Sequence, residues 1–287
     1  MKLDHLRVLE PHPGILAFYD GRVPGHRFAD APNWVDDGAL SLGVASYALM
    51  SGDQAIVYDT HVSVPHARFI RDTLTARGVR DIRVVLSHWH LDHVAGTGAF
   101  ADCPVIANVR TAAHLARHQA GIEDGSFHGA PAIDPLILPD QVFDGHLQLE
   151  LGGEVVELIT ANIHSDDATV IWLPERRILL AGDTVEDCVT YVAEPQGFDA
   201  HLADLARLSA LQPRWVLPNH GAPEVIAQGG YGLGLLEATA SYIRHLQGGE
   251  VQSMAAAIAP YISDGTLRWF EPYEAVHAQN LQRVRGG

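Results

Sequence analysis

The feature that most constrains this chain is a histidine cluster at residues 87–93, which reads Ser-His-Trp-His-Leu-Asp-His. Three imidazoles and one carboxylate follow directly after the apolar run at residues 82–86, which predicts a β-strand. Imidazole nitrogens and carboxylate oxygens are the ligands that zinc and related divalent metals prefer. A strand that ends in such a cluster holds these side chains on a rigid edge. The motif therefore predicts a metal site rather than a solvated, histidine-rich loop.

The spacing of the motif separates it from the helical metal-binding pattern. In His-Glu-x-x-His, the two histidines are four residues apart and share one face of a helix. Here His88 and His90 are only two residues apart, which suits an extended turn. The adjacent pair of Asp92 and His93 suits a second metal beside the first.

Three further candidate ligands follow predicted strands. His164, Asp183 and His220 each come shortly after an apolar, β-rich run. One such residue alone would be weak support, because a histidine in a loop is usually a surface polar group. All three stand just past a strand, as the first cluster does, so one edge of a sheet would bring them together.

Alternating strand and helix patterns predict an α/β fold in which mixed sheets are flanked by helices. Residues 20–40 are rich in Pro, Gly and Asp and predict a long loop. Residues 136–143, 146–151 and 155–160 predict three consecutive antiparallel strands. We expect a single domain over residues 1–287, with a core at about 40–225 and a helical extension at about 231–287.

The charge balance argues against a nucleic-acid partner. The chain of 287 residues carries 19 Lys and Arg against 35 Asp and Glu, a formal net charge of −16. Nucleic-acid binding depends largely on basic contacts to phosphates. No stretch reaches the length of a membrane span, two cysteines are too few for a disulfide framework, and the first residues lack the apolar core of a secretion signal. We therefore expect a cytoplasmic protein with no membrane partner.

The order of the histidines and aspartates between residues 88 and 220 resembles that of the metallo-β-lactamase superfamily. The resemblance runs from about residue 40 to about residue 225. The resemblance implies an αββα sandwich with metals in a cleft along one edge of the sheets. Carried over position by position, it implies two ligand sets that share one bridging carboxylate: His88, His90 and His164 on the first metal, Asp92, His93 and His220 on the second, and Asp183 between them.

Such a site implies two divalent ions, with zinc expected and iron or manganese as alternatives. Two such ions share a bridging water and lower its pKa towards about 7, so that the bridging hydroxide attacks an electrophilic carbon or phosphorus. We predict Asp183 and Asp92 as catalytic residues, because Asp92 could also carry a proton to the leaving group. Asp59 is expected either to orient a ligand or simply to cap a strand.

Departures from the family pattern bear on the substrate. Asp183 stands where the true β-lactamases of the family have Cys or Ser, so antibiotic hydrolysis is not expected. The Gly-Asp-Thr triplet at residues 182–184 resembles the glyoxalase II and nuclease branches. Acyl-homoserine lactonases carry a tyrosine three residues after the bridging aspartate, where this chain has Glu186. Tyr191 is expected to be a packed or surface side chain, and the roles of Glu186 and His61 stay open.

We predict a binuclear metallohydrolase that cleaves a small carboxylic ester, lactone or thioester with a metal-bridging hydroxide. One alternative is a mononuclear iron dioxygenase of the persulfide dioxygenase type, which would use His88 or His90 with His164 and Asp183. The other is a phosphodiesterase or RNA-processing nuclease, against which the acidic balance counts. The expected partner is a small-molecule substrate, and a homodimer is left open.

Overall fold

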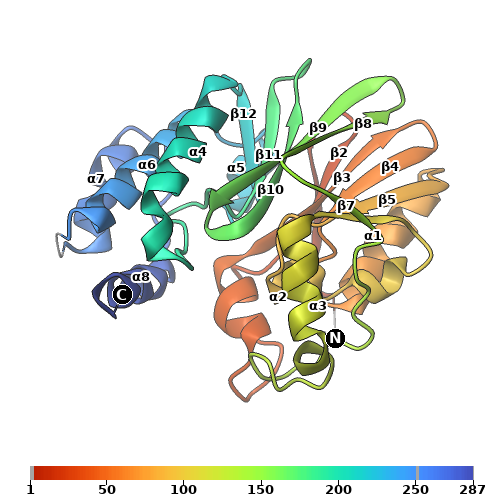
Figure 1. Cartoon of the computed structure of the whole chain (residues 1–287), viewed down its shortest axis with the longest axis horizontal. Helices are drawn as coiled ribbons and strands as arrows, with labels where there is room; N and C mark the ends of the chain where they lie inside the picture. Colours follow the sequence, from red (N-terminus) through yellow and green to blue (C-terminus); the bar gives the residue numbers. More distant parts are fainter. Residues whose placement is uncertain (1–2, 250–251, 287) are drawn as a thin grey trace.

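The computed structural model describes residues 3–249 and 252–286, and these residues form two β-sheets with helices on their outer faces (Figure 1). The first sheet has the strand order β1-β2-β3-β4-β5-β6-β7. Its strands are β1 Arg7–His12, β2 Ile15–Asp20, β3 Val44–Ser51, β4 Gln54–Tyr58, β5 Asp81–Val85, β6 Val105–Asn108 and β7 Gln141–Phe143. The second sheet has the order β12-β11-β10-β9-β8. Its strands are β8 His146–Leu151, β9 Glu154–Ile163, β10 Ser165–Leu173, β11 Ile178–Gly182 and β12 Trp215–Pro218.

The helices fall into two groups that cover opposite sides of the paired sheets (Figure 1). The described α-helices are α1 Val64–Ala76, α2 Leu91–Val94, α3 Val109–Glu123, α4 Phe198–Ala210, α5 Pro223–Ala227, α6 Gly234–Gln247, α7 Met254–Ser263 and α8 Tyr273–Gly286. The short helical segments are η1 Val35–Leu40, η2 Thr97–Phe100 and η3 Pro195–Gly197. The predicted αββα metallo-β-lactamase-like sandwich is therefore confirmed.

Strand β2 illustrates how the sequence creates the layers. Ile15, Ala17 and Tyr19 belong to the hydrophobic core shared with the second sheet. Leu16 and Phe18 point to the other side and pack with the core beneath α1 and α3. Successive side chains of a strand point to opposite faces, so a continuous apolar run is expected where both faces of a sheet are covered.

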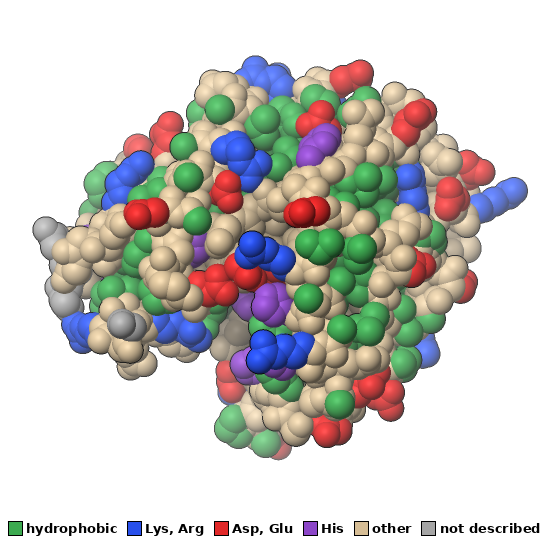
Figure 2. Space-filling view, in the orientation of Figure 1, with side chains coloured by type: hydrophobic (Ala, Val, Ile, Leu, Met, Phe, Trp, Pro, Cys, Tyr) green, Lys and Arg blue, Asp and Glu red, His purple; other side chains and the backbone are tan. Residues whose placement is uncertain are grey.

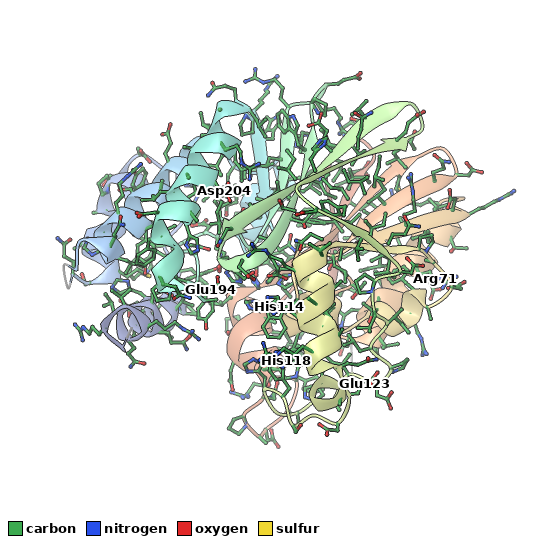
Figure 3. All side chains as sticks on the ribbon, viewed as in Figure 1. Arg71, His114, His118, Glu123, Glu194 and Asp204 are labelled. Atoms are coloured by element: carbon green, nitrogen blue, oxygen red, sulfur yellow. The ribbon has the colours of Figure 1, made fainter. Side chains whose placement is uncertain are left out.

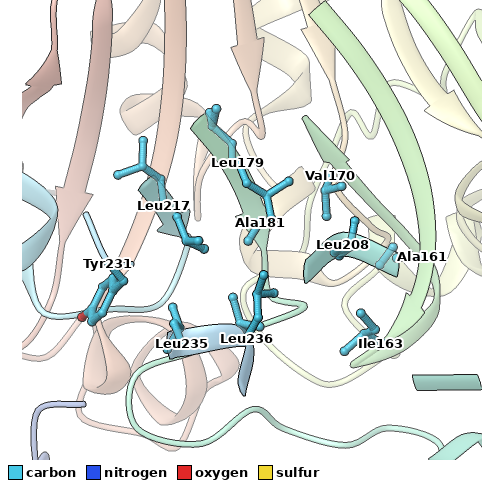
Figure 4. Packing of buried hydrophobic residues seen from close by; sticks show 14 of the residues in the cluster. Ala161, Ile163, Val170, Leu179, Ala181, Leu208, Leu217, Tyr231, Leu235 and Leu236 are labelled. Carbon is cyan, nitrogen blue, oxygen red and sulfur yellow. The ribbon is translucent and has the colours of Figure 1, made fainter. Parts of the chain in front are cut away.

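The outer face of the second sheet packs against α4 and α6. Figure 4 shows side chains of β11 and β12 facing Leu235 and Leu236 of α6, while Leu208 of α4 lies beside β9 and β10. Because α4 and α6 cover this face, only the ends of the strands stay open. Polar residues that follow the strands can therefore lie close together at those ends.

Two expectations from the sequence are wrong in part. Residues 35–40 form the π-helical segment η1 instead of continuing the predicted loop. Residues 136–140 are not in a strand, and β7 pairs in parallel with β6 in the first sheet instead of with β8. The helical extension at the C-terminal end is present as α6, α7 and α8, and the single-domain expectation stays a prediction.

Within the described residues, no helix combines the length and apolar character that crossing a bilayer requires.

Asp187 ties together three segments that are far apart in the sequence. Its Oδ2 accepts a hydrogen bond of 2.6 Å from the hydroxyl of Tyr231, and its Oδ1 accepts one of 2.8 Å from the main-chain N–H of Arg268. The guanidinium of Arg22 donates to the main-chain oxygen of Asp187 at 2.8 Å. The side chain is fully buried, and this burial raises the pKa of Asp187 to about 6.

We expect Asp187→Asn to reduce the pH dependence of the free energy of unfolding. The folded-state pKa lies above the ordinary value of 3.8, so the stability associated with neutral Asp187 is complete below that value. It is lost as the pH rises through about 6. Two pKa units correspond to about 3 kcal/mol. Urea unfolding of both proteins between about pH 4 and about pH 7 measures the difference.

The control for this measurement is Asp30→Asn, a change of the same type at an exposed position. Relative to the unmodified protein, Asp187→Asn should gain stability with rising pH, whereas Asp30→Asn should run parallel to it. An Asp187→Asn curve with the slope of the unmodified protein would contradict the assignment.

Candidate metal centre

The open edge of the sheets gathers the seven predicted ligands into two neighbouring groups. Each group places one nitrogen or oxygen atom per residue within 4.8 Å of the others. The groups are His88, His90 and His164, and Asp92, His93, Asp183 and His220. The first group offers three imidazole nitrogens, and the second offers two imidazole nitrogens and two carboxylate oxygens. Zinc and iron bind both kinds of donor, so each group has the composition of a metal site.

Local structure explains how these side chains reach one place. Residues 86–90 form the loop between β5 and the short helix α2, and this helix carries Asp92 and His93. His164 occupies the reversal between β9 and β10 with a positive φ of 69°. Asp183 follows β11 and His220 follows shortly after β12, and these two strands are parallel neighbours.

Asp183 lies between the two groups. Its Oδ2 is 3.0 Å from His93 Nε2 and 3.3 Å from His220 Nε2. The same oxygen is 3.6 Å from His88 Nε2 and 3.8 Å from His164 Nε2. A single carboxylate oxygen thus faces histidines of both groups, which is the geometry that a bridging ligand needs.

The histidines of the first motif present a fixed nitrogen to the centre. His88 Nδ1 lies 2.9 Å from the hydroxyl oxygen of Ser87, and His93 Nδ1 lies 3.0 Å from Oδ2 of Asp59. In both rings the remaining nitrogen, Nε2, faces Asp183. The partner of one ring nitrogen fixes the orientation of the ring and the role of the other nitrogen.

His220 is held in the same way. His220 Nδ1 lies 2.7 Å from the main-chain oxygen of Gly43. Gly43 has a φ of 76°, and a Cβ at this position would stand 1.9 Å from the hydroxyl oxygen of Tyr19.

His164 Nδ1 lies 3.5 Å from Oε1 of Glu186. His90 differs, because its Nδ1 is the atom closest to the centre, 2.9 Å from His164 Nε2.

Asp59 joins the loops that carry the ligands. Besides His93, its carboxylate accepts hydrogen bonds from the main-chain N–H of Ser87 at 2.7 Å and the hydroxyl of Ser87 at 2.6 Å. The side-chain amide of Asn219, next to His220, donates to it at 2.5 Å. Asp59 is fully buried, so the orienting role is the one that its contacts support.

Two of the three histidines of the first group are in the protonation state that suits metal binding. Burial, reinforced by neighbouring histidines, lowers the pKa of His88 well below its ordinary value and that of His90 to about 3. Both rings are then neutral near pH 7, which is the form that binds a metal. At the third, His164, burial lowers the pKa, but the carboxylates of Glu186 and Asp183 outweigh burial and raise the pKa above its ordinary value.

In the second group, burial also lowers the pKa values of His93 and His220, but the charge of Asp183 outweighs it and raises both well above the ordinary value. A divalent cation at this position would displace their protons.

Two buried atoms test whether a cation fits. Within the described residues, His88 Nε2 and Asp183 Oδ1 have no hydrogen-bond partner. A buried polar atom without a partner costs free energy of about 1–3 kcal/mol, and both atoms belong to the candidate ligands. The seven side chains therefore fit divalent cations in donor type, in geometry and in unsatisfied capacity.

The centre opens into a cavity of about 720 Å³, the main cavity. His90, Asp92 and His220 line its floor, residues 22–42 form one wall, and residues 270–279 before and within α8 form another. In Figure 2, histidine side chains border the hollow near the middle of the face. The volume lies within the range of small-molecule sites, about 300–1,000 Å³.

The structure places two further side chains, Tyr191 and Glu186, beside the candidate metal centre. The expectation that Tyr191 avoids the cleft is wrong, because it lines the main cavity with its ring centroid 5.6 Å from that of His164. Glu186 accepts hydrogen bonds from the main-chain N–H of Tyr191 at 2.8 Å and from the hydroxyl of Tyr273 at 3.0 Å. The proximity of Glu186 to His164 therefore connects α8 to the centre.

Other residues beside the centre were not singled out from the sequence. Asn219, Ser87 and the carbonyl of Gly43 hold ligands in place, and their only sequence signal is that two of them directly precede a ligand histidine. His61, whose role was open, is fully buried with its ring stacked on His66 at 4.3 Å, outside the ligand groups.

Comparison with known proteins agrees with this geometry. The family model described as the metallo-beta-lactamase superfamily matches residues 41–220. The chain is 29% identical over 171 residues to a hydroxyacylglutathione hydrolase from Rhodobacter capsulatus, covering 58% of this chain and 59% of the relative. It is 26% identical over 182 residues to an atrochrysone carboxyl ACP thioesterase from Paecilomyces divaricatus, covering 63% and 51%. The chain thus spans between half and three-fifths of these relatives' length.

Among solved structures, the DIM-1 metallo-β-lactamase superimposes with a TM-score of 0.61 at 20% identity. The match covers 85% of this chain and 99% of that one, and it shows a shared fold. The matching family model covers more than half of the chain, with six of the seven gathered residues inside it and His220 at its last position. The chain therefore belongs to the metallo-β-lactamase superfamily.

Proposed function

We propose that this protein is a binuclear metallohydrolase that cleaves a small carboxylic ester, lactone or thioester, with thioesters favoured. The observation that carries the proposal is the complete second ligand group, which shares Asp183 Oδ2 with the histidines of the first group. With only one ion bound, this second set of two carboxylates and two histidines would hold its negative charge without a cation of its own. Zinc is the expected metal, with iron or manganese as alternatives.

Divalent cations held by these side chains would polarise the substrate carbonyl and make a bound water acidic enough to act as the nucleophile. His88, His90 and His164 would hold the first cation and Asp92, His93 and His220 the second, with Asp183 between them. Asp92 is the ligand best placed for proton transfer, because its side chain is 18% exposed and borders the main cavity. It would pass a proton to the departing thiolate or alkoxide.

Two considerations favour thioesters over other substrates. The relatives include a hydroxyacylglutathione hydrolase and an ACP thioesterase. The main cavity is also lined by exposed polar and charged side chains, among them Arg27 and Gln279. These can hold the long, polar thiol carriers on which acyl groups are transported. The dioxygenase alternative needs only one ion, so the second group counts against it.

Elemental analysis coupled to hydrolysis assays tests the proposal. We expect about two bound ions per chain and metal-dependent cleavage of acyl-thioester and lactone substrates, lost on chelation and restored by added metal. One iron per chain with oxygen consumption would instead establish the dioxygenase. Cleavage of bis-p-nitrophenyl phosphate without any thioester, ester or lactone turnover would establish the phosphodiesterase.

We expect His90→Ala to lower metal content and activity together. Removing one of three ligands leaves the first cation weakly held, and turnover should fall by about hundredfold or more, at least as much as after loss of an orienting partner. His146→Ala is the matched control, because His146 is half-exposed on β8, outside both ligand groups. Full turnover of a His90→Ala protein that has lost metal would defeat the assignment.

We expect Asp59→Asn to weaken metal affinity by about 10–100-fold. Asparagine has the same shape and tolerates the positive φ of 66° at this position, but it removes the negative charge beside His93 Nδ1. Competition against a chromophoric chelator measures the change. Asp53→Asn, at the opposite end of β4, is the control and should leave the affinity unchanged. Equal affinities for both variants would show that Asp59 only caps its strand.

A further inference from the structure

A second, smaller hollow opens beside the candidate metal centre. It has a volume of about 260 Å³. It shares Gly38, His90, Asp92 and Tyr191 with the main cavity, so the two hollows meet at the ligands. We call it the aromatic pocket, because four half-buried ring side chains line it: Trp34, Trp89, Phe127 and Tyr191.

The ring of Trp89 is held firmly in this pocket. It stacks on His114 and His118 of α3, with centroid distances of 5.0 and 5.1 Å, and Phe127 lies 5.4 Å away on the same wall. Figure 3 shows both histidines on α3. The main-chain N–H of Trp89 also donates to Oδ2 of Asp167 at 2.9 Å. These contacts fix the ring of Trp89 between α3 and the pocket.

Trp34 closes the pocket from the opposite segment. Its indole Nε1–H donates to the main-chain oxygen of Pro131 at 3.0 Å, so the polar atom of the ring is already satisfied. Trp34 therefore lines the pocket with the apolar surface of its ring. Aromatic rings attract other rings in offset or edge-to-face arrangements and contribute beyond the area that they bury.

The two hollows differ in charge. The main cavity is lined by charged side chains that include Arg22, Arg27 and Glu186. The aromatic pocket is lined by no Lys, Arg or Glu among the described residues, and its one carboxylate is the candidate ligand Asp92. Its walls therefore suit a flat, uncharged group that is attached to an atom at the metal centre.

We propose that the aromatic pocket binds the acyl group of the substrate and selects aromatic acyl groups. The scissile bond then lies over the ligands, and the thiol or alcohol carrier lies in the main cavity. Relative size sets this direction, because the larger hollow of about 720 Å³ takes the longer carrier and the hollow of about 260 Å³ takes one or two rings. This inference rests on the proposed hydrolase function.

The first test compares benzoyl and acetyl thioesters of the same thiol, N-acetylcysteamine. We expect the metal-loaded protein to favour the benzoyl thioester by about tenfold in kcat/KM. Phe127→Ala should remove that preference mainly by raising KM for the benzoyl thioester. Phe127→Tyr, which keeps the ring, should retain it. An equal loss for both thioesters, or a preference that follows an aromatic thiol instead of the acyl group, would overturn the proposal.

A second test measures binding without turnover and uses Gly38, where the two hollows meet. A Cβ at Gly38 would meet no atom within 4 Å, so Gly38→Leu adds bulk to the open space without a clash. Calorimetry should show that 2-naphthoate binds the unmodified protein about tenfold more tightly than acetate. Gly38→Leu should abolish this difference, and Gly38→Ala, the matched control, should largely keep it.

The two tests separate failure of this inference from failure of the proposed function. If 2-naphthoate binds as expected but no thioester, ester or lactone is cleaved, the hydrolase proposal fails and the aromatic pocket stands as a ring-binding site. If thioesters are cleaved without an acyl preference and 2-naphthoate binds no better than acetate, the hydrolase stands and the aromatic pocket is refuted.

Discussion

The concentration of buried negative charge around His93 is the constraint on which the structure of the site depends. Asp59, Asp92 and Asp183 all lie within 3.4 Å of its ring nitrogens. An ionised carboxylate removed from water costs several kcal/mol unless positive charge and hydrogen bonds compensate it. Protons on histidines supply part of that compensation, and divalent cations would supply it fully. The loops at this edge are accordingly tied by hydrogen bonds to Asp59, so that the charges cannot spread apart.

Much of the fold could be predicted because local patterns and global structure agree. The apolar runs of β2, β4 and β11 are buried on both faces, and such runs are read from sequence without knowing their partners. The prediction failed at β7, where the Asp144-Gly145 turn suggests a hairpin with β8. The segment instead joins β6, with the Asp140 carboxylate accepting from the N–H of Val105 at 3.0 Å. Pairing between strands that are far apart in the sequence, such as β6 and β7, leaves no signal in the local amino-acid pattern.

In the candidate site too, some features could be predicted from the sequence and others could not. All seven predicted ligands are gathered, because donor type and position after a strand are visible in the sequence. That they bind metal stays a prediction. The side chains that orient them were mostly invisible, since their roles come from contacts formed in space. Glu186 is the clearest case, because its partner Tyr273 lies 87 residues further along the chain. The aromatic pocket likewise combines residues from four separate segments.

The two residues that orient His93 and His220 differ in kind. Asp59 acts through its side chain, whereas Gly43 offers a main-chain carbonyl that every amino acid possesses. No substitution can delete that acceptor, yet position 43 tolerates no larger residue, because the hydroxyl of Tyr19 occupies the space of a Cβ. Mutational scanning would thus find both positions intolerant of substitution, for opposite reasons. Position 59 needs its carboxylate, whereas position 43 needs the absence of a side chain.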